Sequence, residues 1–225
     1  MDRTGEIAMV VAAVGRTAVR AGRPVVVGVS GPCGAGKSTL ARALVLALPG
    51  SVRLRGDDFL DPARSHRRSS DWDGVDRARL VATVLRPFRD GTPSRFRRYD
   101  WAAGRLGEPE PVPRADVLVV DLVGLLHPEV LPVLDLTVWC DTDPAVARCR
   151  GQRRDRLLGR SHDRLWDEVW VPNDRDFAAR FQPREAADLL YLPVGTPGTV
   201  GPTGSGPTSC DNGGSDDRSR PAGAP

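Results

Sequence analysis

The stretch Gly31-Pro32-Cys33-Gly34-Ala35-Gly36-Lys37-Ser38-Thr39 has the form G-x-x-x-x-G-K-S and lies between an expected strand and an expected helix. Glycines allow a backbone to wrap closely around a phosphate, and the N-terminus of the following helix adds positive potential. The Lys37 ammonium can reach the β- and γ-phosphates, and the Ser38 hydroxyl can coordinate Mg²⁺. The motif predicts a nucleoside-triphosphate site formed by Gly31, Cys33, Gly34, Ala35, Gly36, Lys37, Ser38 and Thr39.

Lysine is used only once in this chain, and it stands in that loop. Of 32 basic residues, 31 are arginine, which leaves Lys37 alone (32 − 31 = 1). A compact ammonium on a flexible stem differs from a planar guanidinium in size and reach. The alternative is a chance glycine-rich turn before a helix, but the complete motif, its setting and its lysine favour the phosphate site.

Length and composition exclude several classes of protein. A chain of 225 residues with 40% hydrophobic content suits one domain with a sizeable core and excludes global disorder. Its apolar runs are shorter than the roughly 18–20 residues of a membrane helix. The net charge of +3 is small for this length and argues against a dedicated nucleic-acid binder. Four cysteines without a C-x-x-C pair disfavour a disulfide framework or a zinc site and favour the cytoplasm.

Strand and helix patterns alternate along most of the chain. Apolar runs predict strands at residues 24–30, 51–55, 116–120, 134–140 and 191–194. Helices are expected at residues 7–14, 37–48, 76–88 and 143–158, and an irregular segment up to residue 114. This alternation predicts a three-layer α/β fold with a mainly parallel sheet in a domain spanning residues 1–194. Residues 195–225 are rich in Gly, Pro, Ser and Thr, which predicts a disordered tail.

Two carboxylates follow expected strands at the edge where ligands bind in open α/β sheets. Asp57 could take a proton from an acceptor hydroxyl or hold Mg²⁺. Asp121 ends an apolar strand like the carboxylate that binds Mg²⁺ through water in many nucleotide-binding proteins. An Asp-rich turn or a helix cap is the alternative for Asp57, and a capping residue is the alternative for Asp121.

Together with the phosphate loop, three short segments resemble the uridine kinase family, which includes nicotinamide riboside kinase and phosphoribulokinase. They are Asp57-Asp58-Phe59, Tyr99-Asp100 and Arg154-Asp155, and the resemblance covers roughly residues 24–193. The resemblance implies a P-loop NTPase fold. It also implies that ATP is the co-substrate, that Mg²⁺ is the metal, and that the phosphoryl group is transferred to a hydroxyl of a small molecule.

The same resemblance implies roles on the acceptor side. Asp57 corresponds to the general base near Mg²⁺, and Asp58 is assigned beside it to substrate binding. Asp73 is the preferred counterpart of the family's sugar-binding aspartate, with Asp71 as the alternative. Tyr99 matches a tyrosine that packs against the base. Uridine kinases commonly carry a histidine shortly afterwards, where this chain has about Gly104, so the preference for a pyrimidine is open.

An arginine-rich helix follows at residues 143–158 and is expected to act as a lid. In the resembling kinases, guanidinium groups of this region cover the phosphates and stabilise the charge that develops in transfer. Arg154 matches the family's lid arginine best, and Arg150 and Arg160 are its companions. A solvated face or a nucleic-acid patch is the alternative, but no aromatic residues alternate with the arginines.

These observations predict an ATP-dependent kinase that phosphorylates a small alcohol, most simply the 5′-hydroxyl of a nucleoside. Other acceptors stay open, among them a sugar phosphate, a pantothenate-like alcohol or an antibiotic. A nucleotide-dependent switch is the alternative of another class, but the N-K-x-D guanine motif is absent because Lys37 is the only lysine. No nucleic-acid or membrane partner is expected, and the oligomeric state is open.

Overall fold

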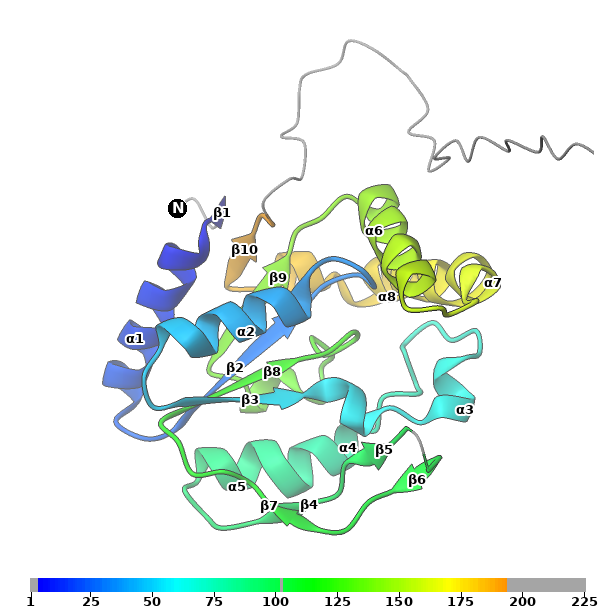
Figure 1. Ribbon diagram of the computed structural model, residues 1–225. Helices are drawn as coiled ribbons and strands as arrows, with labels where there is room; N and C mark the ends of the chain where they lie inside the picture. The colour runs from blue at the N-terminus through cyan, green and yellow to red at the C-terminus, as the bar shows by residue number, and fades with distance from the viewer. Residues whose placement is uncertain (1–3, 102, 194–225) are drawn as a thin grey trace, which may run out of the picture.

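The computed structural model describes residues 4–101 and 103–193, and it centres on a sheet whose strands all run parallel. The six strands lie in the order β1-β10-β9-β2-β8-β3 (Figure 1). In that order they are Thr4–Gly5, Leu189–Tyr191, Leu136–Cys140, Val25–Ser30, Val117–Asp121 and Ser51–Arg55. The predicted α/β fold with a parallel sheet is confirmed.

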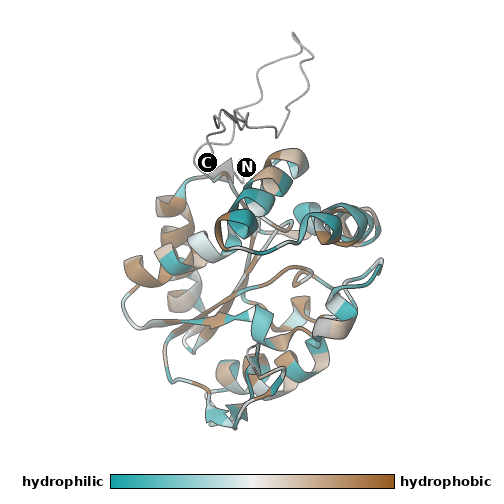
Figure 2. Ribbon diagram, turned by 45° about the vertical axis from the view of Figure 1, so that its right-hand side comes forward, coloured by the Kyte–Doolittle hydropathy of each residue, from teal (hydrophilic) through white to brown (hydrophobic). Residues whose placement is uncertain are grey.

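The central strands β2, β8 and β9 are buried on both faces, and their successive side chains point to opposite sides of the sheet. Val25, Val27 and Val29 pack in one apolar cluster, whereas Val26 between them packs in the other. All six residues of β2 are buried. Figure 2 shows hydrophobic colour on the central strands and a mixture of hydrophobic and hydrophilic colour on the helices around them. The continuous apolar runs of the sequence are therefore strands covered by helices on two sides.

Helices cover each face of the sheet (Figure 1). On one side lie α1 (Ile7–Ala21) and α2 (Lys37–Ala47). On the other, α4 (Arg77–Leu80), the π-helical η2 (Val81–Leu85) and α5 (Arg86–Arg89) form one continuous helical stretch. A 3-10 turn η1 (Gly56–Phe59) and the short α3 (Pro62–Ser65) follow β3. A further 3-10 turn, η3 (Leu131–Val133), precedes β9.

The arginine-rich segment is a helix that lies across the end of the sheet where the phosphate motif is. This helix, α6 (Pro144–Leu157), begins at Asp143, whose side chain accepts hydrogen bonds from the backbone amides of Ala145 and Val146. It is followed by α7 (Asp163–Leu165), the π-helical η4 (Trp166–Trp170), α8 (Val171–Phe181) and α9 (Pro183–Ala186). The expected lid is thus one arm of a longer helical region that also covers the sheet.

Most boundaries agree with the sequence predictions to within one or two residues, and the larger differences are the following. The last strand is Leu189–Tyr191 rather than residues 191–194, because Pro193 has no N–H to donate to a neighbouring strand. The first helix extends to Ala21 and ends at Gly22, which has a left-handed φ of 60°. The segment up to residue 114 is not wholly irregular, and the helices after residue 162 had no predicted counterpart.

Two short antiparallel pairs lie within that supposedly irregular segment. They are β4 (Arg95–Phe96) with β7 (Glu110–Pro111), and β5 (Tyr99–Asp100) with β6 (Arg105–Leu106). Strands of two residues leave too little alternation in the sequence to be recognised.

Three further expectations concern cysteines, membranes and the tail. Cys33 and Cys140 are free thiols. Within residues 4–101 and 103–193, the helices are too short or too polar to cross a membrane. The predicted disordered tail, residues 195–225, lies outside the described residues.

Close packing at one glycine gives a test of how α6 is held. A Cβ built on Gly151 would lie 2.1 Å from the ring of Trp166, which is buried. Gly151→Ala should lower the free energy of unfolding by about 1–3 kcal/mol through overpacking, although alanine favours helix by up to about 1 kcal/mol. Gly15→Ala in α1 is the matched control, because no atom lies within 4 Å of its Cβ. Urea denaturation of both variants checks this, and equal stability of Gly151→Ala and the unmodified protein would contradict the packing.

Candidate active site

The loop between β2 and α2 has a backbone that only glycines adopt readily. Gly31, Gly34 and Gly36 have φ values of 151°, 82° and 97°, all in the range that side chains with a Cβ disfavour. Gly36 is also the N-cap of α2, so the free amides of the first turn of that helix open toward the loop. A Cβ on Gly34 would lie 2.0 Å from the Ala147 carbonyl oxygen of α6. The arginine-rich helix therefore rests directly on the loop backbone, whose Cys33 and Ala35 amides are already hydrogen-bonded.

Lys37 lies over the first half of the loop. Its Nζ donates hydrogen bonds to the carbonyl oxygens of Gly31 and Pro32, at 2.9 and 2.7 Å. The charge of this ammonium opposes the effect of burial on the pKa values of Asp57 and Asp174. The ammonium of Lys37 therefore favours the ionised form of both Asp57 and Asp174.

Asp121 and Ser38 form a bonded pair at the end of β8. The Ser38 hydroxyl donates to Asp121 Oδ2 at 2.6 Å. The Arg53 guanidinium binds the same carboxylate through two nitrogens, Nε to Oδ1 at 2.6 Å and Nη2 to Oδ2 at 2.7 Å. Because Asp121 is only 4% exposed and holds three hydrogen bonds, it orients the Ser38 hydroxyl from behind. The sequence did not anticipate Arg53, an arginine in the middle of a strand.

The second half of the loop, Asp57 and the lid arginines border a single cleft of about 800 Å³. Asp57 lies in η1, directly after β3, and loss of water around its carboxylate raises its pKa against the effect of Lys37. The cleft brings together nine of the predicted residues, namely Gly34, Gly36, Lys37, Ser38, Thr39, Asp57, Arg150, Arg154 and Arg160. Arg42, Arg53 and Arg55 also line it, so its wall is strongly cationic.

The lid arginines are organised by one buried acid. Asp155 is 2% exposed, and its carboxylate accepts hydrogen bonds from Arg154 Nη2 and Trp166 Nε1, both at 2.9 Å. Arg160 Nη1 lies 4.0 Å from the same carboxylate. Burial alone would raise the pKa of Asp155, but the hydrogen bonds from Trp166 and Arg154 lower it. Asp155 therefore stays ionised and draws two of the lid arginines together.

The oxygen donors in the cleft suit Mg²⁺ shared with a nucleotide. Magnesium in such sites usually takes one or two protein oxygens together with phosphate oxygens and water. Ser38 and Asp57 border the cleft beside Lys37 and supply such oxygens. Among the described residues, no cluster of three or more His, Cys, Asp or Glu could hold a metal alone. Asp121 was predicted to bind Mg²⁺ through water, but its carboxylate already accepts hydrogen bonds from Arg53 and Ser38. It therefore supports the magnesium site by orienting the Ser38 hydroxyl.

The predicted acceptor residues do not line this cleft. Asp58 is 3% exposed, and its carboxylate pairs with Arg98 Nη1 at 3.3 Å. Asp73 is exposed, and Tyr99 packs edge-on against Trp101 with ring centroids 4.9 Å apart. Their assignment to substrate binding therefore stays a prediction.

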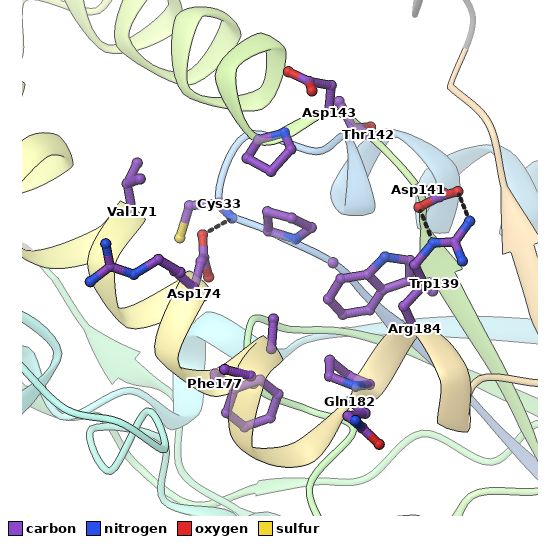
Figure 3. Close-up of a pocket in the computed structure, with 18 of the residues that line it drawn as sticks. Cys33, Trp139, Asp141, Thr142, Asp143, Val171, Asp174, Phe177, Gln182 and Arg184 are labelled. Atoms are coloured by element: carbon purple, nitrogen blue, oxygen red, sulfur yellow. Dashed lines mark hydrogen bonds and ion pairs between the residues drawn. The ribbon is translucent and has the colours of Figure 1, made fainter. Parts of the chain in front are cut away.

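Sequence reasoning also missed Asp174, which borders a second cavity of about 720 Å³ (Figure 3). This cavity is lined by Gly31, Pro32 and Cys33 of the phosphate loop and by residues of α8, Phe177 among them. The pKa of Asp174 is raised to about 6 because the carboxyl is buried. No local motif points to this residue, since its partners come from distant parts of the chain.

The pairing of Arg53 with Asp121 can be tested by removing the cation. Arg53→Gln leaves a buried carboxylate with Ser38 as its remaining side-chain partner, so the free energy of unfolding should fall by about 3 kcal/mol. Arg55→Gln, an exposed arginine of the same strand, is the control and should change stability by less than about 0.5 kcal/mol. Urea denaturation distinguishes them, and equal losses in both variants would contradict a specific role of Arg53.

Comparisons with known proteins agree with this geometry. The chain is 32% identical over 146 residues to the uridine kinase of Leuconostoc citreum, covering 59% of this chain and 69% of that protein. It is 28% identical over 152 residues to the uridine kinase of Alkaliphilus metalliredigens, with the same coverage of both chains. It is also 32% identical over 122 residues to uridine-cytidine kinase C of Dictyostelium discoideum, but spans only 27% of that longer protein. No protein-family model matches the chain.

Solved structures share the fold at lower sequence identity. A possible uridine kinase from Bacillus stearothermophilus has a TM-score of 0.59 at 16% identity, covering 75% of this chain and 89% of that chain. A provisionally named fructose transport system kinase from Silicibacter sp. TM1040 has a TM-score of 0.59 at 20% identity, covering 81% and 98%. By its similarity to relatives at about 30% identity and by its three-layer fold with a phosphate loop and an arginine lid, the chain belongs to the uridine kinase-like family of P-loop kinases.

Proposed function

We propose that this chain is a kinase that transfers the γ-phosphoryl group of ATP to the 5′-hydroxyl of a nucleoside. The observation that carries the proposal is the single cleft that holds the phosphate loop, Asp57 and the lid arginines. Such an arrangement suits phosphoryl transfer, in which catalysis consists mainly of positioning and electrostatic stabilisation. The relatives named uridine kinase support a nucleoside as acceptor.

The triphosphate would lie on the loop amides at the N-terminus of α2. Lys37 would turn from the loop carbonyls to the β- and γ-phosphates, because phosphate oxygens carry more negative charge than carbonyls. Ser38 and Asp57 would hold Mg²⁺, which neutralises charge on the phosphates when bound. Asp121 and Arg53 would keep the Ser38 hydroxyl in place.

Transfer would proceed by attack of the acceptor oxygen on the γ-phosphorus, as the bond to the bridging oxygen of ADP breaks. Asp57 would accept the proton of the attacking hydroxyl, so it must be ionised when substrate binds. Arg154, with Arg150 and Arg160, would stabilise the negative charge on the transferred group. Because Arg150 and Arg154 belong to α6, which rests on the loop at Gly34, and Arg160 follows the end of that helix, closure of the lid would also exclude water.

A different small alcohol is the second candidate acceptor. Gly104 stands where uridine kinases commonly carry a base-recognising histidine, and its left-handed φ of 66° belongs to a tight turn between β5 and β6. Without that side chain, the site has less power to select a pyrimidine. A screen of purified protein with Mg-ATP against nucleosides, sugars and pantothenate, read by mass spectrometry for the gain of one phosphate, decides between these acceptors.

The assigned base gives a sharp test of the chemistry. Asp57→Asn should lower kcat at least about 100-fold, since general base catalysis contributes that much or more, while the dissociation constant of metal-free ATP changes by less than about threefold. Asp61→Asn is the matched control, because Asp61 is a helix N-cap and asparagine caps equally well. Steady-state rates and calorimetry measure both quantities.

The pH dependence adds an independent readout of the same residue. Because the pKa of Asp57 is raised, the active carboxylate should be lost on acidification at a higher pH than for an ordinary aspartate, whose pKa is about 3.9. The rate of the unmodified protein should therefore fall on acidification while the protein stays folded, and the residual rate of Asp57→Asn should lack that dependence. Equal kcat values for Asp57→Asn and Asp61→Asn would contradict the assignment.

A further inference from the structure

Asp174, in the first turn of α8, forms hydrogen bonds to two segments that are distant in the sequence, the phosphate loop and the segment around Trp72. Asp174 Oδ2 accepts a hydrogen bond from the backbone amide of Cys33 at 2.7 Å. Its other oxygen, Oδ1, accepts one from Trp72 Nε1 at 3.1 Å. Figure 3 shows Asp174 pointing from α8 to Cys33 at the edge of the cavity. The phosphate loop and residue 72 are therefore joined through a single side chain.

The segment around Trp72 carries Asp71 and Asp73, the candidates for binding the acceptor. Trp72 is 2% exposed and has a φ of 55°, a left-handed conformation that costs a bulky residue energy. The Arg77 guanidinium holds this conformation by donating to the carbonyl oxygens of Asp71 and Trp72. A strained backbone persists only where its surroundings fix it, so this segment is held in one defined position.

Two neighbours of Asp174 hold the preceding part of the same segment. Asn173 is 1% exposed, accepts a hydrogen bond from the Ser69 amide at 2.9 Å and donates one to the Arg67 carbonyl at 2.9 Å. Trp170 Nε1 donates to the Ser65 carbonyl oxygen at 3.2 Å. The end of η4 and the start of α8 thus bind residues 65–72 along their length, and Asp174 alone among these three extends the contact to the phosphate loop.

The negative charge of Asp174 is unfavourable in its folded surroundings. Burial raises its pKa to about 6, although Lys37 and the hydrogen bond from the Cys33 amide act against that effect. Between its ordinary pKa and about 6 the folded protein holds the proton more tightly than the unfolded chain does. Stability due to this group therefore falls as pH rises through that range, and the ionised form at neutral pH costs folding free energy. A costly group at a nucleotide-binding loop points to function.

We propose that Asp174 is a positioning residue that sets the phosphate loop and the acceptor-binding segment at one fixed separation. This inference rests on the proposed kinase function. The attacking hydroxyl and the γ-phosphorus must approach along one line, and small displacements of either are costly in rate. With one oxygen on each segment, the carboxylate of Asp174 transmits the position of the loop directly to the residues that would hold the acceptor.

Two variants and one control test this role by hydrogen exchange of the full chain. Asp174→Asn has nearly the same shape, but its amide can accept one of the two hydrogen bonds and presents an N–H₂ group to the other donor. Trp72→Phe removes only the indole N–H and leaves the Cys33 contact. Glu168→Gln repeats the acid-to-amide change in η4, at an exposed residue bonded to exposed Arg164.

In the free protein, Asp174→Asn should increase exchange at least about threefold in both residues 31–38 and residues 67–74, with Glu168→Gln unchanged. Trp72→Phe should increase exchange in residues 67–74 alone. A non-hydrolysable Mg-ATP analogue should then protect both segments in the unmodified protein, but only the loop in either variant. An increase in neither segment of Asp174→Asn, or protection that still extends to residues 67–74 in both variants, would overturn the proposal.

Turnover separates this role from a general loss of structure. With the acceptor that the unmodified protein phosphorylates, Asp174→Asn should lower kcat about tenfold and change KM for ATP by less than about threefold. A purely structural role would lower the folded fraction and leave the kcat of the folded protein unchanged, which contradicts the proposal. If the unmodified protein binds no nucleotide, the proposed function fails, whereas the exchange of the free variants still decides whether Asp174 joins the two segments.

Discussion

The space around Gly34 is the constraint on which the rest of the site depends. Its φ of 82° and the Ala147 carbonyl, 2.0 Å from where a Cβ would be, leave room for no side chain. Because Gly34 has no side chain, the backbone of the loop can lie directly against α6. The arginines of α6 then border the same cleft as Lys37, and the contact that closes the site is made by backbone atoms.

Near the phosphate loop, arginine side chains are held in place by ion pairs with aspartates. Asp155 gathers Arg154 and Arg160, while Arg53 neutralises Asp121 behind Ser38. A guanidinium bound to a carboxylate keeps its planar geometry and further N–H donors, so it can still bind phosphate. The cleft therefore presents preorganised positive charge while Asp121 and Asp155 stay paired, and such preorganised charge is what electrostatic catalysis requires.

The fold and the phosphate site could be predicted because their signals are local. Buried strands are continuous apolar runs, and the loop is a fixed pattern of glycines with one lysine between a strand and a helix. Asp57 and Asp58 show where such reasoning ends. They are adjacent in sequence, but the 3-10 turn directs Asp57 to the cleft and buries Asp58 against the half-exposed Arg98. Arg53 and Asp174 were missed because their partners lie 68 and 141 residues away, at Asp121 and Cys33, so only the folded chain brings them together.

The most direct test of the account is the binding of Mg-ATP to the cleft, measured by titration calorimetry on the folded protein. The account predicts binding by the unmodified chain and a loss of affinity of at least about tenfold in Lys37→Ala, since a charge-assisted contact to phosphate is removed. Arg20→Ala, in the last turn of α1 and exposed, should bind as the unmodified chain does. Equal affinity in Lys37→Ala, or no affinity in the unmodified protein, would contradict the account.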